Sequence, residues 1–246
     1  MVYVASRSGI HHEVSEDAVL AGTHILKEAS GIIDFPKTGF ICVADGVGGN
    51  RGGAAAAQFV LDRLSTTVTN PERLRNDLNS INQSLIEYAN NTPGATNMAT
   101  TLTGIAICGG SYHLIHVGNT RAFIKQGRYL KQITSDHTTY HWLMSSGQYE
   151  AAELCNKNEI TNCFGGANQA LLAKLVVTEL NPFSLMLLTS DGVHEYIDLD
   201  VLEDILSGEG SYEDKCETIL GEAINHGSED DMTIVVIVPS EKESSK

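Results

Sequence analysis

The stretch FICVADGVGGNRGGAAAAQFVLDRL, residues 40–64, decides the fold class that we predict for this chain. It begins with a short apolar run, which ends at Asp45-Gly46. A glycine-rich turn follows and leads into an alanine-rich run. A short apolar run bounded by turn residues indicates a buried strand, whereas alanine has the highest helix propensity. The sequence therefore predicts a strand at residues 40–44 and a helix at residues 53–64, with a carboxylate where the strand leaves the core.

The rest of the chain extends this pattern into an antiparallel sheet with helices. Gly109-Gly110 and Gln126-Gly127 each separate two strand-like runs, which predicts hairpins. Asn70 with Pro71 predicts a helix start, and apolar residues then recur at three- and four-residue steps from Leu74 to Ala89. A second apolar stripe at residues 216–223 predicts a late helix. We expect an α+β fold of two antiparallel sheets packed face to face with flanking helices. The further strands are expected at residues 101–107, 112–117, 122–125, 171–177, 185–188 and 232–238.

Composition narrows the class of protein. The chain has 31 Asp and Glu against 16 Lys and Arg, a net charge of −15, which opposes binding to nucleic acid or to an anionic membrane. No secretion signal or membrane span is evident, and the 5 cysteines form no CxxC pair, so we expect a cytoplasmic protein with reduced thiols. We expect one domain over residues 1–239, a polar tail at residues 240–246, and a monomer.

Acidic residues recur where apolar runs begin or end. Asp45-Gly46 and Asp191-Gly192 each follow such a run, residues 229–231 precede a third, and Glu16-Asp17 stands before a fourth. One Asp-Gly pair alone indicates a turn. Several carboxylates at sheet ends, in a chain with few basic residues, favour a site for hard divalent cations such as Mg²⁺ and Mn²⁺.

These stretches resemble the metal-dependent protein phosphatases related to protein phosphatase 2C, particularly the compact bacterial members. The resemblance extends from about Ser6 to Val238 and rests on six short motifs in the family's order. In this sequence the motifs read VADGVGG at residues 43–49, MATTL at 98–102, HVGNTRA at 116–122, ITSDH at 133–137, LTSDGV at 188–193 and SEDDMT at 228–233.

The resemblance implies a four-layer α-β-β-α sandwich that binds two Mn²⁺ or Mg²⁺ ions. Asp45 would bridge the ions, and the Gly46 carbonyl would bind one of them. Asp191 and Asp230 would complete the protein ligands of the second ion. These three aspartates would be the catalytic residues, and a flap at about residues 138–164 would lie beside them.

Further ligand roles follow from the same resemblance. Glu16 and Asp17 would hold metal-bound waters. Asp230 is preferred to Asp231 because Asp231 falls at the family's Asn, although a register slip of one residue stays open. Asn119 replaces the family's usual Asp at a third metal site, which should therefore be weaker because the amide carries no charge.

The implied reaction is direct attack of a metal-bridging water on the phosphorus of a phosphate monoester. The substrate would be a phosphoserine or phosphothreonine protein, and a Ser/Thr kinase is an expected partner by family habit. An alternative is a weakly active pseudophosphatase or a phosphopeptide-binding regulator. A hydrolase of small phosphate esters or a nuclease is less favoured.

Two departures from the family concern the reacting phosphate. His12 stands where relatives carry a phosphate-binding Arg. His12 therefore either contacts the phosphate or is only a surface loop residue. In the second case His11 or Arg7 would take the place of the missing Arg through a shifted loop. Val47 stands where eukaryotic relatives have a proposed acid His, so a metal-bound water would protonate the leaving group.

Overall fold

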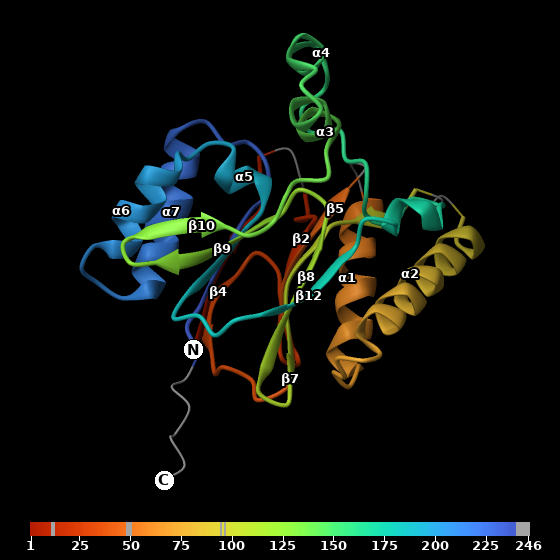
Figure 1. Cartoon of the computed structure of the whole chain (residues 1–246), viewed down its shortest axis with the longest axis horizontal. Helices are drawn as coiled ribbons and strands as arrows, with labels where there is room; N and C mark the ends of the chain where they lie inside the picture. Colours follow the sequence, from red (N-terminus) through yellow and green to blue (C-terminus); the bar gives the residue numbers. More distant parts are fainter. Residues whose placement is uncertain (11–12, 48–50, 94, 96, 240–246) are drawn as a thin grey trace.

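Two antiparallel sheets lie face to face between two layers of helices in the computed structural model (Figure 1). The structure describes residues 1–10, 13–47, 51–93, 95 and 97–239. One sheet has the strand order β10-β9-β13-β14-β1-β4, and we call it the β14 sheet. The other has the order β11-β6-β5-β7-β8-β12, with β2 paired to β5 and β3 to β2, and we call it the β5 sheet.

The strands are short, and every pair described is antiparallel. The strands of the β14 sheet are β1 (Val2–Arg7), β4 (Ser30–Ile33), β9 (Arg121–Gln126), β10 (Tyr129–Gln132), β13 (Met186–Thr189) and β14 (Met232–Ile237). Those of the β5 sheet are β2 (Asp17–Ala21), β3 (His24–Leu26), β5 (Gly39–Val47), β6 (Ala99–Thr100), β7 (Leu102–Cys108), β8 (Ser111–Val117), β11 (Phe164–Gly165) and β12 (Val176–Leu180).

Helices cover the outer face of each sheet. The helices α1 (Arg51–Thr66) and α2 (Leu74–Asn91) lie against the β5 sheet (Figure 1). The helices α6 (Leu199–Ser207) and α7 (Tyr212–Asn225) lie against the β14 sheet. The predicted order of layers, helix on sheet on sheet on helix, is therefore confirmed. None of the helices in the described ranges is both long and apolar enough to cross a bilayer.

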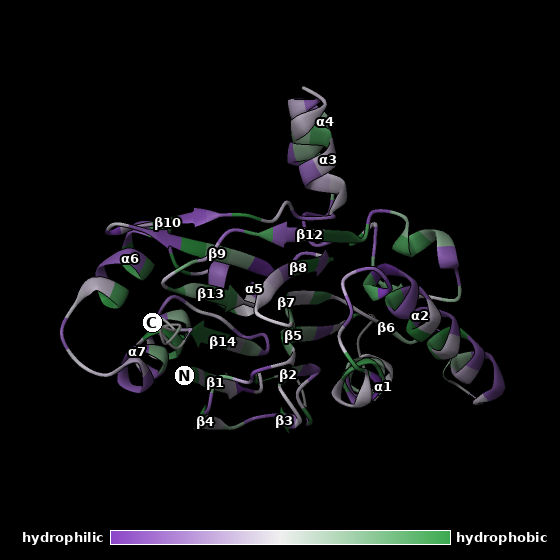
Figure 2. Ribbon diagram, turned by 60° about the horizontal axis from the view of Figure 1, so that its bottom comes forward, coloured by the Kyte–Doolittle hydropathy of each residue, from purple (hydrophilic) through white to green (hydrophobic). Residues whose placement is uncertain are grey.

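Each sheet is buried on both faces. Alternate residues of a strand point to opposite sides of the sheet, so one strand contributes to two cores. In β5, Phe40 and Cys42 belong to the core beneath α1 and α2, whereas Ile41 and Val43 belong to the core between the sheets. Figure 2 shows apolar strands in the centre and the more polar surfaces of the helices outside. The same alternation places Asp45 on the side of β5 that faces the other sheet.

Two short helices stand away from the sandwich. The helices α3 (Thr139–Ser145) and α4 (Tyr149–Leu154) project from one end of it (Figures 1 and 2). Thr138 forms an isolated β-bridge at their base. The helices lie within residues 138–164, the segment predicted as a flap, and we keep that name for this segment.

Most predicted elements are present, and two are wrong. The strand expected at residues 171–177 begins only at Val176, in β12, because the chain first forms a 3₁₀ helix (Gln169–Leu172), which the Asn168 side chain caps by accepting the Ala170 N–H at 2.9 Å. The helix expected to start at Asn70 starts later, because Asn70 accepts the Glu72 N–H in a turn and α2 begins at Leu74.

Candidate active site

The predicted acidic residues meet at one end of the interface between the sheets. Asp17 opens β2 and pairs directly with Asp45 of β5. Asp191 follows β13 and begins the short helix α5 (Asp191–His194), while Asp230 directly precedes Asp231, the residue before β14. The Ser190 N–H donates to the Thr233 carbonyl at 3.0 Å, which joins the ends of β13 and β14.

Asp231 joins the two sheets at this end. It is 3% exposed, and its carboxylate accepts the Gly9 N–H at 2.8 Å and the Glu16 N–H at 2.6 Å. Asp230 is exposed by contrast, and one of its carboxylate oxygens accepts the Asp231 N–H at 2.8 Å. Of the two neighbours that the register left open, Asp231 has both carboxylate oxygens occupied by backbone groups, whereas Asp230 has a solvent-facing carboxylate.

The carboxylates repel one another strongly. Burial, followed by the carboxylates of Asp191 and Asp17, raises the pKa of Asp45 well above its usual value. Burial also raises the pKa of Asp17 to about 8, against the nearby hydroxyl groups of Ser190 and Thr233, which lower it. The pKa of Asp191 is raised to about 7, by burial first and then by Asp230. A group of carboxylates that disfavour their own ionisation is suited to bind cations.

The backbone at Asp45 is fixed by two threonines of the MATTL motif. The Thr101 N–H donates to the Asp45 carbonyl at 2.8 Å, and the Asp45 N–H donates to the Thr101 hydroxyl at 3.0 Å. The Thr100 hydroxyl donates to the same carbonyl at 3.0 Å. The sequence indicated this motif only by resemblance, whereas the structure shows that it holds the end of β5 in place.

Gly46 and Gly53 let helix α1 approach the end of β5 closely. A Cβ atom at Gly53 would overlap the Glu16 carboxylate and would lie 2.8 Å from the Gly46 carbonyl carbon. A Cβ atom at Gly46 would overlap the backbone of Gly53 in turn. Glycine is therefore required at both positions for packing, and the contact holds Glu16 (6% exposed) beside the site.

The donor chemistry fits hard divalent cations. No three His, Cys, Asp or Glu side chains of the described ranges are arranged as a complete metal site. Mg²⁺ retains several waters, however, and usually takes only one or two carboxylates. The Oδ1 atom of Asn119 is buried without a hydrogen-bond partner, while its Nδ2 donates to Asp191 at 2.9 Å. Carboxylates with raised pKa values and an adjacent unsatisfied amide oxygen provide an all-oxygen donor set of this kind.

His137, near the site, has structural contacts with the backbone of two neighbouring segments. The His137 Nδ1 accepts the Gly118 N–H at 3.2 Å, and burial lowers the pKa of His137 to about 4, so its ring is neutral. Its backbone also pairs with Gly118 and with Thr161 of the flap. His137 thus ties the flap base to the loop that carries Asn119.

His194 was not predicted from the sequence, and it lies three residues after Asp191 in the same short helix. Its Nδ1 lies 2.9 Å from the Thr189 hydroxyl, and its buried Nε2 has no hydrogen-bond partner. Burial, followed by the nearby Arg121, lowers its pKa well below the usual value. Its place in the LTSDGVHE run next to an Asp-Gly motif was the available signal.

Some predicted residues lie outside the described ranges, or have other contacts. His11, His12 and residues 48–50 of the glycine-rich turn are outside these ranges. Arg7, the other candidate for phosphate binding, forms an ion pair with Glu217 of α7. Arg121 forms a bidentate pair with Asp136.

A group of carboxylates at the end of a two-sheet sandwich is typical of a metal-dependent hydrolase. A family model described as protein phosphatase 2C matches residues 28–223. The chain therefore belongs to the protein phosphatase 2C family, as the motifs predicted.

Relatives and solved structures agree with this assignment. The serine/threonine phosphatase stp of Listeria welshimeri is 27% identical over 213 residues, which cover 80% of this chain and 83% of that protein. The crystal structure of the serine/threonine phosphatase Stp1 from Staphylococcus aureus has a TM-score of 0.78 at 25% identity, and the match covers 97% of this chain and 94% of that chain. The catalytic domain of PstP in complex with two manganese ions has a TM-score of 0.73 at 21% identity, and the match covers 96% of this chain and 98% of that one. At that identity the likeness to PstP shows the fold alone.

Proposed function

We propose that this chain hydrolyses phosphoserine and phosphothreonine monoesters in proteins, with two Mn²⁺ or Mg²⁺ ions bound at the carboxylates described above. The observation that carries the proposal is the convergence of Asp17, Asp45 and Asp191 at one end of the sheet interface, where burial and neighbouring carboxylates disfavour their charged forms, in a chain of the protein phosphatase 2C family. Bound cations would stabilise the charged forms. The names of the relatives, which are serine/threonine phosphatases, support the choice of substrate class.

The ligand roles are part of the proposal. Asp45 would bridge the two ions, the Gly46 carbonyl would bind the first ion, and Asp191 and Asp230 would bind the second. Glu16 and Asp17 would hold waters on the ions, and Asn119 would contribute to a weaker third site. When bound, such ions lower the pKa of water and stabilise negative charge on a phosphoryl group.

The protein's own contribution is to hold these oxygens before the substrate arrives. Thr100 and Thr101 fix the Asp45 backbone, and Asp231 fixes the loops that carry Glu16 and Gly9. Oxygens fixed in this way need no reorganisation when charge develops in the transition state. The solvent-facing carboxylate of Asp230 would let an ion at that position meet the substrate.

Other parts of the functional hypothesis stay predictions. We propose that His12 contacts the substrate phosphate, because it precedes Glu16-Asp17 where relatives carry an Arg. A Ser/Thr kinase partner, a monomeric state and a cytoplasmic location are also predictions.

The test is release of phosphate from a phosphothreonine peptide and from p-nitrophenyl phosphate, measured with Mn²⁺, Mg²⁺ or EDTA. Wild type is compared with Asp191→Asn and with the control Asp62→Asn, an exposed α1 residue bonded to Gln58. We expect turnover that needs metal, a loss of at least about 10- to 100-fold for Asp191→Asn, and little change for Asp62→Asn.

One outcome would overturn the proposal. If folded, metal-loaded wild type binds the peptide but releases no phosphate from either substrate, the enzyme assignment is wrong. The phosphopeptide-binding regulator would then take its place. The amide contact between Asn119 and Asp191 is the feature of the site that this alternative would rest on.

A further inference from the structure

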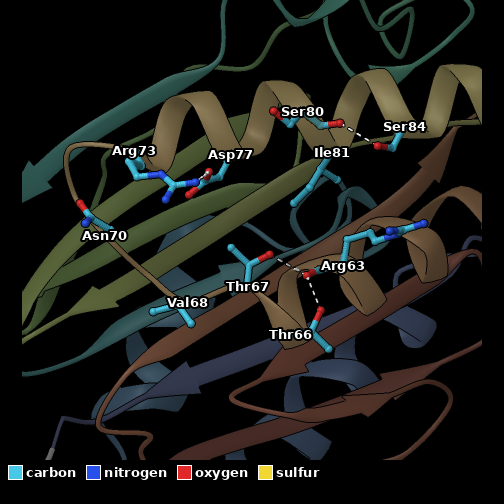
Figure 3. Close-up of a pocket in the computed structure, with 10 residues that line it drawn as sticks. All are labelled: Arg63, Thr66, Thr67, Val68, Asn70, Arg73, Asp77, Ser80, Ile81 and Ser84. Carbon is cyan, nitrogen blue, oxygen red and sulfur yellow. Dashed lines mark hydrogen bonds and ion pairs between the residues drawn. The ribbon is translucent and has the colours of Figure 1, made fainter.

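The polar groups of the pocket between α1 and α2 already have partners. This pocket has a volume of about 440 Å³ and is lined by residues of both helices and of the turn between them (Figure 3). Its hydroxyl groups donate to helix carbonyls, as Thr66 and Thr67 do to Arg63, and its Arg73 pairs with Asp77. These groups need no ligand, so the α1–α2 pocket carries no inference.

A loop outside the six family motifs reaches the segment that carries two of the predicted metal-site residues. Residues 27–29 join β3 to β4, and we call them the β3–β4 loop. The Glu28 carboxylate in this loop accepts the Ser15 N–H at 2.7 Å. Ser15 directly precedes Glu16 and Asp17, and its hydroxyl oxygen accepts the Asp17 N–H at 3.1 Å. Glu28 therefore fixes the first residue of the Ser15-Glu16-Asp17 segment.

Each backbone N–H of this segment donates to a side chain. The Ser15 N–H donates to Glu28, the Asp17 N–H donates to the Ser15 hydroxyl, and the Glu16 N–H donates to Asp231. Ser15 is fully buried, so its N–H needs an acceptor supplied by the protein. The position of Glu16 and Asp17 thus depends on Glu28 as well as on Asp231.

The β3–β4 loop is anchored on both sides of Glu28. Lys27 Nζ donates to the Ala54 carbonyl of α1 at 3.1 Å. The Ala29 carbonyl accepts the Ser6 N–H of β1 at 3.1 Å. Between these anchors Glu28 has a φ of 47°, a left-handed conformation that is uncommon for residues other than glycine. Such a conformation is unfavourable and persists where surrounding contacts hold it, commonly at functional sites.

The same loop also borders the other side of Glu16. Ala54, which accepts from Lys27, follows Gly53, and a Cβ atom at Gly53 would overlap the Glu16 carboxylate. The loop therefore contacts the start of α1 through Lys27 and the residue before Glu16 through Glu28. These contacts hold the backbone on two sides of one predicted metal-site carboxylate.

We propose that Glu28 is a positioning residue for the metal site, which holds Ser15 and through it Glu16 and Asp17 in the arrangement that binds divalent cations. The inference rests on the proposed function, because it takes Glu16 and Asp17 as the residues that hold waters on the ions. Glu28 acts through its hydrogen bond and not through its charge. Glutamine keeps an acceptor oxygen and should replace Glu28, whereas alanine offers none.

Isothermal titration calorimetry with Mn²⁺ measures the effect directly on the full chain. We expect Glu28→Ala to raise the dissociation constant for Mn²⁺ by about 10-fold, as the loss of a group that orients metal ligands does. Glu28→Gln should stay within about 2-fold of wild type, because its side-chain oxygen can accept the Ser15 N–H.

Glu203→Ala is the matched control. The Glu203 carboxylate of α6 accepts the Leu130 N–H at 2.7 Å, which is the same kind of bond at the same length. Leu130 lies in β10, an edge strand that carries none of the predicted ligands. Glu203 is more buried than Glu28, so its truncation should cost at least as much stability. We expect its dissociation constant for Mn²⁺ to equal that of wild type.

A purely structural role of Glu28 would give a different signature. Partial unfolding lowers the number of Mn²⁺ sites per chain and leaves the dissociation constant of the folded fraction unchanged. Hydrolysis of p-nitrophenyl phosphate gives a second readout, in which Glu28→Ala should need more Mn²⁺ for half-maximal activity while KM for the ester stays constant. If Glu28→Ala does not fold, Glu28→Met, which keeps the length of the side chain without a carboxylate oxygen, takes its place.

The outcomes separate this inference from the proposed function. An unchanged dissociation constant in the folded alanine or methionine variant refutes the positioning role and leaves the phosphatase assignment intact. A loss in Glu28→Gln as large as in Glu28→Ala also refutes it, because charge would then be the cause. Wild type that binds Mn²⁺ without hydrolysing any substrate refutes the phosphatase assignment, and the calorimetric comparison still decides the inference. Wild type that binds no Mn²⁺ refutes both.

Discussion

The Asp17 carboxyl should make the metal-free protein less stable as the pH rises. Asp17 is fully buried, and its pKa of about 8 exceeds the value of 3.8 expected for an unperturbed aspartate. Between these values the folded protein holds a proton that the unfolded chain has lost. The free energy of unfolding therefore falls as the pH rises from about 4 to about 8.

The magnitude follows from the same two values. Each pH step of one costs about 1.4 kcal/mol, so the full penalty approaches about 5 kcal/mol at pH 8. Asp17→Asn removes the ionisable group while keeping its shape, but an imperfectly bonded buried amide costs about 1–3 kcal/mol. We therefore expect the metal-free variant to be more stable than wild type by about 2–4 kcal/mol at pH 8, and to lose that advantage near pH 4.

Urea unfolding in EDTA at pH 4, 6 and 8 measures this difference. Asp204→Asn, which removes an exposed carboxylate near Arg128, is the control and should change stability by no more than about 0.5 kcal/mol. Added Mn²⁺ should stabilise wild type more than Asp17→Asn. A wild-type stability that stays constant from pH 4 to pH 8, or an Asp17→Asn variant that is less stable at pH 8, would refute the reasoning.

Four further predictions concern the scaffold and the metal ligands. Gly53→Ala should destabilise the protein by about 1–3 kcal/mol in thermal unfolding, because the added methyl group overlaps Glu16 and the backbone of Gly46; unchanged stability would show that α1 can move away. Asp231→Ala should lower stability by about 1–3 kcal/mol, since it leaves two buried N–H groups unsatisfied. Asp230→Ala should instead lower Mn²⁺-dependent activity with little effect on stability, and the reverse pattern would exchange the roles of these neighbours. Asn119→Asp should lower the Mn²⁺ concentration needed for full activity, because a carboxylate binds a hard cation better than an amide does; an unchanged metal titration would count against a third site there.

The central strands and their acidic ends were predictable because the signals are local. Residues 40–44 form an apolar run bounded by Asp-Gly, and β5 includes this run within Gly39–Val47. The hairpin at Gly109-Gly110 is equally local, and β7 and β8 pair across it. The apolar spacing after residue 70 predicted α2, but the first turn was misplaced, because the Asn70 side chain can cap a turn as well as a helix.

The first strand was not predicted, because its stability depends on distant partners. The strand β1 lies between β14 and β4, so Val4 pairs with Val235 across almost the whole chain length. A short run such as residues 2–7 gives little local signal for such a partner. The 3₁₀ helix at Gln169–Leu172 was missed for a related reason, because its apolar residues read equally well as a strand.

The sequence by itself determined the family and predicted which residues carry the chemistry. Asp45, Asp191 and Asp230 were identifiable because each stands where an apolar run ends or begins, and the order of the motifs identified the family. Their distances and protonation were not accessible from the sequence, since both depend on strands that meet only in the folded protein.

The tertiary structure alone decided which groups have hydrogen-bond partners and which lack them. The β2–β5 register sets Asp17 beside Asp45, and burial then raises the pKa values of both. The same packing leaves one oxygen of Asn119 and one nitrogen of His194 without partners beside the flap. Burial and hydrogen-bond satisfaction are properties of the whole packed molecule, because they depend on every element that surrounds a group, and a linear sequence does not contain them.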